Sequence, residues 1–306
     1  MNSLATTQFI FVGGAIKSGT TLTEQILSTQ KAFIGLGEVD HFVQQEKLFH
    51  SRALRYGPFE KLLCSCGEEF QICSFWGPLT GQLRSRTNSN YFERYASVVE
   101  QAEEFVSSSD RPFVIVDSSK EPEALIRLHD FSEAYFGDWF RVKVVLVFRD
   151  PRNWLVSDER NSTAGQGLRK LRVRRRRMRK WASRYWTLRK VAESRGLELV
   201  VIRLRDIQRN PNGAVRVVLS RLLPDWPFRP FTTLADANSH IVWGSHHRLT
   251  SSINGKIWQN YRLERPGVWL VPWLTTPTAW RSFLMLNWML WKQSWAPWDS
   301  NPRPTD

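Results

Sequence analysis

The sequence contains little cysteine and no long uninterrupted apolar run. Three cysteines in 306 residues are too few for a disulfide framework, which points to a reducing compartment or to a small local site. Residues 1–14 lack the basic region of a signal peptide, and their short apolar run leads directly into a glycine loop. Proline and arginine interrupt the apolar, Trp-rich residues 268–292, which is unlike a transmembrane helix. We therefore expect a cytoplasmic protein.

Positive charge is concentrated in one segment. The chain has 43 basic and 29 acidic residues, a formal net charge of +14, and nine of the basic residues fall within Arg169–Lys180. The rest of the chain carries only +5. A composition of 42% hydrophobic and 24% charged residues is typical of a soluble globular protein and excludes collagen-like and wholly disordered chains.

Short runs of β-branched and aromatic residues alternate with segments of helical spacing. The four apolar runs are 9–12, 113–116, 142–148 and 197–204, and the helical segments after them are 21–30, 121–135, 151–162 and 212–223. This alternation predicts an α/β fold, with a central parallel sheet covered by helices on both faces. Ligands of such sheets bind beyond the carboxyl ends of the strands, so the residues that follow each run are the candidates for chemistry.

Two segments lie outside this alternation. About a hundred residues separate the first two apolar runs, too many for one crossover helix, so we expect residues 38–110 to form a helical insertion that shapes a substrate pocket. Residues 258–306 form a Trp-rich C-terminal extension with eight of the fifteen tryptophans. We expect a helix there that docks on the core, and contact with a membrane surface is the alternative. No linker divides the chain, which predicts a single domain over 1–306.

The segment between the first strand and the first helix is glycine-rich and contains a lysine. It reads GGAIKSGTT over Gly13–Thr21 and would present backbone N–H groups and a helix N-terminus to an anion. Against the nucleotide-binding pattern G-x-x-x-x-G-K-[ST], the two glycines and Thr21 match, but Thr20 stands at the lysine position. The lysine is displaced into the loop, at Lys17. The predicted sheet is therefore P-loop-like.

These residues resemble the first motif of sulfotransferases that use 3′-phosphoadenosine 5′-phosphosulfate (PAPS), which reads roughly K/R-S-G-T-T after a strand. The second motif of that family is similar to Arg149–Arg152 with Ser157, again directly after a strand. Further pieces resemble bacterial members: Gly37–Glu38, the D-S-S-K of Asp117–Lys120, and the Cys64–Trp76 segment with its three cysteines. A tyrosine common in relatives is missing from Arg203–Asp206.

The resemblance implies residues that bind PAPS as co-substrate. They are Lys17, Ser18, Gly19, Thr20, Thr21, Arg149, Ser157 and Arg248. Arg149 and Ser157 would hold the 3′-phosphate. Arg248 belongs to a late stretch that keeps His240, Gly244 and Arg248 of the family pattern but lacks its Asn-Pro.

The predicted reaction is in-line transfer of a sulfuryl group to an acceptor hydroxyl or amine. A sulfuryl group carries less charge than a terminal phosphoryl, so lysines and N–H groups can serve without an obligatory metal. Lys17 would stabilise the leaving phosphate oxygens and Lys120 the transferring group. Glu38 is the predicted general base, and His41 is the alternative. The class of acceptor stays open.

The three cysteines have the spacing C-x-C-x6-C, at Cys64, Cys66 and Cys73. Free thiols, one local disulfide, and a zinc site completed by His41 or His50 are all compatible with this spacing. We assign no metal on the sequence alone.

The segment Arg169–Lys180 lies in a predicted helix. It is either a solvated basic helix or an anion-binding rim for a charged acceptor or a lipid surface; nucleic acid is disfavoured because no nucleic-acid module accompanies it. Two other functions compete with sulfuryl transfer. One is a P-loop kinase or nucleotide hydrolase that uses Asp117 to support magnesium, and the other is a basic adaptor or membrane-surface protein without enzymatic activity.

Overall fold

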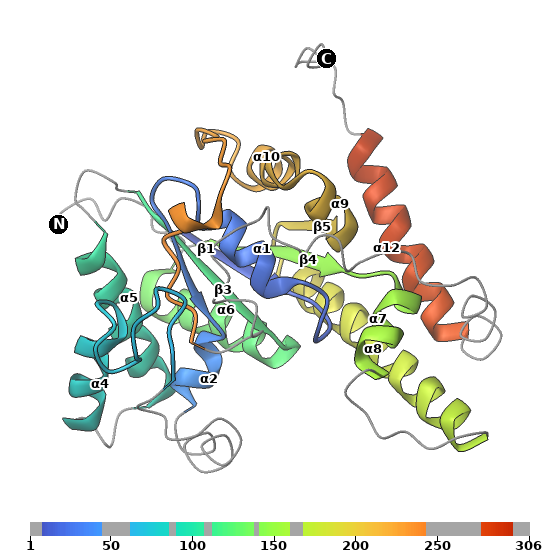
Figure 1. Ribbon diagram of the computed structural model, residues 1–306, viewed down its shortest axis with the longest axis horizontal. Helices are drawn as coiled ribbons and strands as arrows, with labels where there is room; N and C mark the ends of the chain where they lie inside the picture. Colours follow the sequence, from blue (N-terminus) through green and yellow to red (C-terminus); the bar gives the residue numbers. More distant parts are fainter. Residues whose placement is uncertain are drawn as a thin grey trace.

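The centre of the computed structural model is a five-stranded parallel sheet (Figure 1). The structure describes residues 8–44, 62–85, 90–106, 112–137, 141–159, 168–242 and 277–295. The strand order is β2-β3-β1-β4-β5. The strands are β1 (Gln8–Gly13), β2 (Phe33–Gly37), β3 (Val114–Lys120), β4 (Val142–Phe148) and β5 (Leu199–Arg203). All five carboxyl ends therefore lie at one edge of the sheet.

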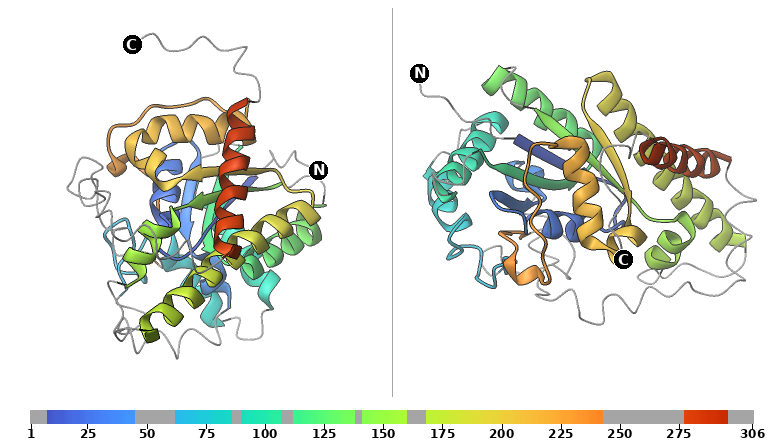
Figure 2. Two further views of the ribbon diagram at one scale, coloured as in Figure 1. Left: turned by 90° about the vertical axis from the view of Figure 1, so that its right-hand side faces the viewer. Right: turned by 90° about the horizontal axis from the view of Figure 1, so that it is seen from above.

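Helices cover both faces of this sheet, which confirms the predicted fold class. Those over one face are α1 (Thr20–Leu27), α9 (Leu204–Arg209) and α10 (Pro211–Leu222), and those over the other include α6 (Pro122–Phe136) and α8 (Leu168–Ser194). The others are α2 (Val39–Val43), α4 (Trp76–Ser85), α5 (Tyr91–Phe105), α7 (Pro151–Glu159) and α12 (Pro277–Trp295). Figures 1 and 2 show α4 and α5 at one end of the molecule and α12 at the other.

The alternation of side chains along each strand builds two cores. In β1, Phe9 and Phe11 pack into one core, whereas Ile10 and Val12 pack into the other. All four are fully buried. A strand buried on both faces needs the near-continuous apolar sequence seen here, because successive side chains point to opposite sides.

The strands differ from the sequence prediction in two places. The prediction missed β2, whose sequence FIGLG is short and has two glycines, residues that weaken a strand signal. It also placed Asp117–Lys120 after a strand, whereas β3 continues through Lys120. The helices α2, α4 and α5 lie within residues 38–110, where a helical insertion was expected.

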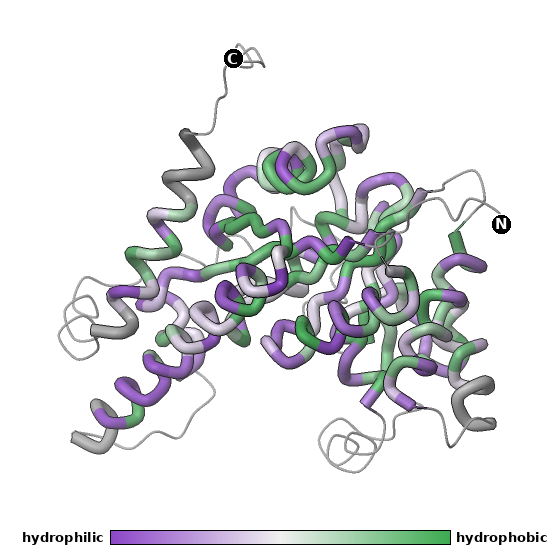
Figure 3. The backbone as a smooth tube through the Cα atoms, turned by 180° about the vertical axis from the view of Figure 1, so that it is seen from behind, coloured by the Kyte–Doolittle hydropathy of each residue, from purple (hydrophilic) through white to green (hydrophobic). Residues whose placement is uncertain are grey.

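The long helix α8 contains the basic segment Arg169–Lys180, and its hydrophilic first half projects from the body of the molecule (Figure 3). Its second half packs against the core through Trp181 and Tyr185. Helix α12 packs on α8 and β5, and Leu286 is its fully buried contact. Within the described part of the chain, no helix is both long enough and apolar enough to cross a bilayer.

Candidate active site

The loop between β1 and α1 is held in shape by two glycines. A Cβ at Gly14 would lie 2.6 Å from the Val147 carbonyl oxygen of β4, so only glycine lets the loop approach the sheet this closely. Gly19, which caps α1, has a φ of 97°. The first turn of α1 therefore begins directly beyond the carboxyl end of β1, with its backbone N–H groups at that edge.

The Ser18 hydroxyl lies inside this loop and is fully buried. Among the described residues it has no hydrogen-bond partner of ordinary geometry, and the Tyr185 hydroxyl of α8 is its polar neighbour. A buried polar atom without a partner is costly, so its place in a loop of this kind fits an anionic ligand whose oxygen completes the bond. The residues present thus fit a phosphate-bearing donor.

Residues of the second motif meet the loop at Lys17. The Arg149 guanidinium donates to the Lys17 carbonyl over 3.3 Å, and the Lys17 ammonium donates to the Ser157 carbonyl over 3.0 Å. The same ammonium lies 3.7 Å from an Asp158 carboxylate oxygen. Beside them, the indole of Trp154 donates to the Ile16 carbonyl over 2.7 Å. The structure therefore brings Lys17 together with Arg149 and Ser157, although each of these two is more than 130 residues from Lys17 in sequence.

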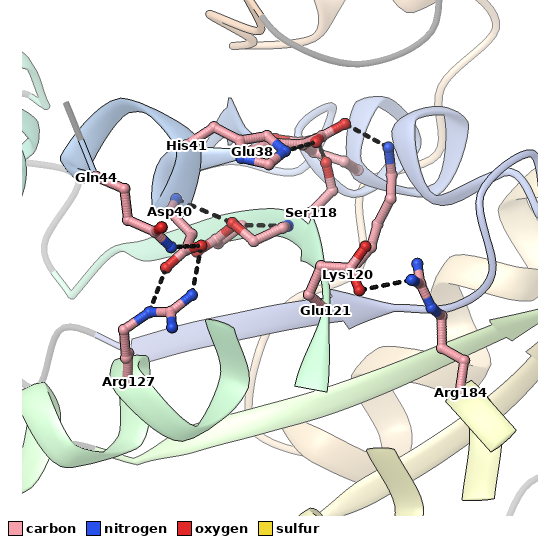
Figure 4. A network of polar contacts seen from close by, with 12 residues as sticks. Glu38, Asp40, His41, Gln44, Ser118, Lys120, Glu121, Arg127 and Arg184 are labelled. Carbon is pink, nitrogen blue, oxygen red and sulfur yellow. Dashed lines mark hydrogen bonds and ion pairs between the residues drawn. The ribbon is translucent and has the colours of Figure 1, made fainter. Parts of the chain in front are cut away.

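A second group of charges gathers at the ends of β2 and β3 (Figure 4). Lys120 is the register partner of Gly13, so it stands directly beside the start of the loop. Its ammonium lies 2.5 Å from Glu38 Oε1, and His41 Nε2 lies 2.7 Å from Glu38 Oε2. The predicted general base Glu38 thus contacts both the alternative base His41 and the predicted stabilising lysine Lys120.

Glu38 is buried but ionised. Burial by itself raises the pKa of this carboxyl, yet Lys120 and His41 outweigh that effect and hold its pKa well below the ordinary range. A carboxylate in this position has two charged or polar neighbours and little contact with water. It is available as a hydrogen-bond acceptor at every physiological pH.

Backbone strain accompanies both candidate lysines. Lys17 has a φ of 68° and Lys120 a φ of 66°. A side-chain-bearing residue in this left-handed region costs about 1–2 kcal/mol, and such residues persist where the surrounding structure fixes them, often at functional sites. Both lysines are therefore aimed by the fold rather than by local preference.

Helix α2, which carries His41, is fixed by a buried aspartate. Arg127 of α6 donates two hydrogen bonds to Asp40, of 2.8 and 2.7 Å, and the Tyr91 hydroxyl of α5 donates a third of 3.0 Å. The Asp40 backbone N–H donates to the Ser119 hydroxyl of β3. These contacts lock α2 to three other elements and so determine where Glu38 and His41 stand.

Glu24 of α1 is the fully buried partner of the same sheet edge. The Gly37 N–H and the Ser118 hydroxyl both donate to its carboxyl group. Burial raises the pKa of Glu24 to about 8, in spite of these two hydrogen bonds. Glu24 is therefore largely protonated at neutral pH and acts as a neutral tie between α1, β2 and β3.

Asp117, which a kinase-like function would use for magnesium, accepts hydrogen bonds from neighbouring protein groups instead. Its Oδ1 accepts from the Ser119 N–H and hydroxyl, and its Oδ2 accepts from the Tyr95 hydroxyl over 2.8 Å. Burial raises its pKa to about 6, against the effect of those hydrogen bonds. An aspartate that is 1% exposed and bonded through both oxygens is poorly placed to support a metal ion.

Comparison with known proteins covers the part of the chain that carries this site. A family model described as "Sulfotransferase family" matches residues 9–228, which include the loop, Glu38, Lys120, Arg149 and Ser157. The chain belongs to the sulfotransferase family. A search of curated proteins returned no match.

A solved sulfotransferase domain shares the fold of this sulfotransferase. The sulfotransferase domain of the Synechococcus PCC 7002 olefin synthase aligns with a TM-score of 0.54 at 15% identity, covering 92% of this chain and 94% of that one. A sulfotransferase domain from the curacin biosynthetic pathway aligns with a TM-score of 0.48 at 18% identity, covering 91% and 96%.

Some residues of this sulfotransferase site were missed by sequence reasoning, and others lie outside the described residues. Glu24 and Asp40 were missed because an acidic residue on an amphipathic helix gives no sign that it is buried. Arg248 and His50 lie outside the described residues. Arg203, at the end of β5, donates to Asn287 of α12.

The protonation of Glu24 predicts a pH-dependent stability. Its folded pKa of about 8 lies above the ordinary 4.5, so the bound proton stabilises the fold fully below pH 4.5, and this stability is lost as the pH rises toward 8. The loss approaches about 1.4 kcal/mol per pH unit. Glu24→Gln keeps the neutral form, since the Ser118 hydroxyl can accept from the new amide. The variant should gain stability relative to the wild type as the pH rises.

Thermal unfolding of the two proteins from pH 5 to 8.5 measures this difference. Glu104→Gln is the matched control, because Glu104 is exposed on α5, and its curve should follow the wild type. Parallel curves for Glu24→Gln and the wild type would show that Glu24 is already ionised in the folded protein.

Proposed function

We propose that this sulfotransferase moves the sulfuryl group of PAPS to an acceptor hydroxyl or amine. The observation that carries the proposal is the position of two sites at one sheet edge. The phosphate loop follows β1, and the Glu38–Lys120 pair, 2.5 Å apart, stands at the ends of the neighbouring strands β2 and β3. A donor anchored in the loop would present its reactive end to a lysine and a base.

The residues that would hold the donor are those of the loop together with Arg149 and Ser157. Backbone N–H groups at the start of α1 and the Ser18 hydroxyl within the loop suit phosphate oxygens. Arg149 and Ser157 already meet the loop at Lys17, which supports their assignment to the 3′-phosphate. Arg248 remains a prediction from the family pattern. The donor supplies the sulfuryl group and a phosphate leaving group.

Lys120, Glu38 and Lys17 divide the remaining work. Lys120 would exchange part of its contact with Glu38 for the oxygens of the transferring group, as the negative charge on them is redistributed. Glu38 would accept the proton of the attacking hydroxyl, because it is ionised and within reach of the same edge. His41 shares its second oxygen and is the alternative proton acceptor. The Lys17 ammonium would exchange its contact with Asp158 for the oxygens of the leaving phosphate.

The proposal predicts that adenosine 3′,5′-bisphosphate raises the melting temperature in the presence of EDTA, because a ligand bound only by the folded state stabilises it. Arg149→Ala should weaken this binding by roughly 1.5 to 3 kcal/mol through loss of a charge-assisted contact. Arg152→Ala is the matched control, since that guanidinium is paired with Asp150 at 2.5 Å and should leave affinity close to the wild type. Thermal shift and calorimetric titration measure both.

AMP, which lacks the 3′-phosphate, serves as the comparison ligand. An equal shift with AMP would remove Arg149 and Ser157 from the 3′-phosphate site. A shift that requires magnesium would favour the kinase-like alternative instead. Transfer of label from PAPS to a panel of hydroxyl and amine acceptors then tests the reaction itself.

A further inference from the structure

Three cysteines and one histidine from distant parts of the chain meet beside the sheet. Cys64, Cys66 and Cys73 belong to the segment before α4, and His240 lies more than 160 residues later. Their ligand atoms all lie within 4.8 Å of one another. Neither the phosphate loop nor the Glu38 group uses any of these side chains.

The distances within this cluster are those of four ligands around one ion. Cys66 Sγ lies 3.7 Å from Cys73 Sγ, and His240 Nδ1 lies 3.3 Å from Cys73 Sγ and 3.9 Å from Cys64 Sγ. A tetrahedral zinc with Zn–S of about 2.3 Å and Zn–N of about 2.0–2.1 Å separates two sulfurs by about 3.8 Å and a sulfur from a nitrogen by about 3.6 Å. The three separations given above differ from these values by at most about 0.3 Å, and all four ligand atoms lie within 4.8 Å of one another.

The surroundings hold each ligand in place. Cys64 and Cys73 are fully buried and His240 is 5% exposed, whereas Cys66 reaches the surface. Gly67, with a φ of 94°, closes a turn in which its N–H donates to the Cys64 carbonyl. The His240 ring stacks on Phe75 and meets the edge of Phe105, with centroids 5.5 and 4.8 Å away. The indole of Trp76 donates to the His240 carbonyl.

We propose that Cys64, Cys66, Cys73 and His240 bind one zinc ion in a closed, structural Cys3His site. Three soft thiolates and an imidazole are the ligand set that selects zinc over the hard cations. The thiols lose their protons to solvent as the metal binds, and no electron is transferred. The fourth ligand is thus His240 and not His41, which contacts Glu38 instead.

The site would pin the insertion to the edge of the sheet. Near the cluster, the Ser65 N–H donates to the Ile241 carbonyl, and the Ser65 hydroxyl bonds to Ser239. Residue Ser239 in turn forms a parallel bridge with Gly35 of β2, and β2 leads into Glu38. Zinc would therefore join the segment of Cys64–Cys73 to the segment of His240, which pairs with β2, and would stabilise the strand end that carries the proposed base.

A disulfide within the cluster and a metal site elsewhere in the chain are the two alternatives, and both fit less well. A disulfide needs sulfurs about 2.05 Å apart, whereas all three cysteines are free thiols and Cys66 Sγ lies 3.7 Å from Cys73 Sγ. A second group of potential ligands, His129, Asp130 and Glu133, has exposed carboxylates and an arginine, Arg195, 2.5 Å from Asp130. Arg195 already pairs with Asp130, so this second group gives a control for metal binding.

The metal content of the purified full chain tests the proposal. Protein expressed in zinc-supplemented medium and freed of loose metal by gel filtration should hold one zinc per chain by mass spectrometry of the elements. Exchange with cobalt(II) should produce thiolate charge-transfer absorption and the d–d bands of a tetrahedral ion. A chain without retained metal or cobalt bands would overturn the proposal, as would a loss of two hydrogens in the intact mass, which marks a disulfide.

Variants locate the site. Cys66→Ser removes the exposed ligand and disturbs packing least, so it should lower the charge-transfer intensity by about one third, for one of three thiolates, or lose the metal. His129→Gln and Ser74→Ala are the controls and should keep full metal content, because neither side chain belongs to the cluster. Retention of the full cobalt spectrum in Cys66→Ser would place the metal elsewhere. Chelation should also lower the melting temperature, and added zinc should restore it.

Discussion

Replacement of Glu38 by glutamine is expected to lower kcat by about a hundredfold to ten-thousandfold, the contribution of a positioned general base. Glutamine keeps the shape of the side chain and can still accept from Lys120, but it cannot take the proton of an acceptor. Affinity for adenosine 3′,5′-bisphosphate should change little, because Glu38 contacts Lys120 and His41 rather than the loop. Single-turnover rates with saturating PAPS measure the chemical step.

His41→Gln is the matched comparison, because His41 holds the other Glu38 oxygen at 2.7 Å. A larger loss in His41→Gln than in Glu38→Gln would make His41 the base and Glu38 its orienting partner. If Glu38 is the base, kcat/KM of the wild type should not fall through protonation of Glu38 at any pH down to about 4.5, the ordinary pKa of a glutamate. Its depressed pKa keeps it ionised throughout that range. A rate that falls on acidification well above pH 4.5 would contradict the assignment of Glu38 as the base.

Replacement of Lys120 by alanine should lower kcat by about 10²–10³, the effect of removing one preorganised donor from a transition state. Bisphosphate affinity should fall far less, because the proposed partner of Lys120 is the transferring group, which the bisphosphate lacks. Lys17→Ala is expected to behave in the same direction. Equal losses in kcat and affinity would mark either lysine as a binding residue only.

The Lys120 variant has a second readout that a structural role would not produce. Burial raises the pKa of Glu38, and Lys120 is the strongest influence that lowers it. Without that lysine the pKa should rise, so the base becomes protonated on acidification, and activity should fall as the pH drops through the new pKa. Lys190→Ala, whose ammonium lies over Trp186 on α8, should keep the wild-type pH profile. An unchanged pH profile in Lys120→Ala would separate Lys120 from the base.

Much of the fold and part of the site could be predicted because local sequence carries them. The strands β1 and β4 are nearly continuous apolar runs, and the glycine loop and Arg149 stand directly after them. Parallel topology then brings strand ends to one edge, which is why Lys17, Lys120 and Arg149 could be placed together without knowledge of the strand order.

The missing parts depend on contacts that no local pattern records. β2 was missed because two glycines interrupt its apolar run. The buried state of Glu24 depends on Ser118 and Gly37, which approach only once the sheet has formed. His240 was assigned to a nucleotide-binding stretch, and its position beside the cysteines follows from the bridge between Ser239 and Gly35. Such long-range contacts are set by tertiary packing alone.

The strand order also determines when β1 can pair during synthesis of the chain. β1 is made first, but its two neighbours are β3 and β4, so Phe9 must wait for Ile115 and Val142 before it can pair on either side. At a translation rate of about 5–20 residues per second, this delay is on the order of ten seconds. During this delay, the apolar side chains of β1 are exposed on the ribosome. The nascent chain should therefore be a client of chaperones until β4 has emerged.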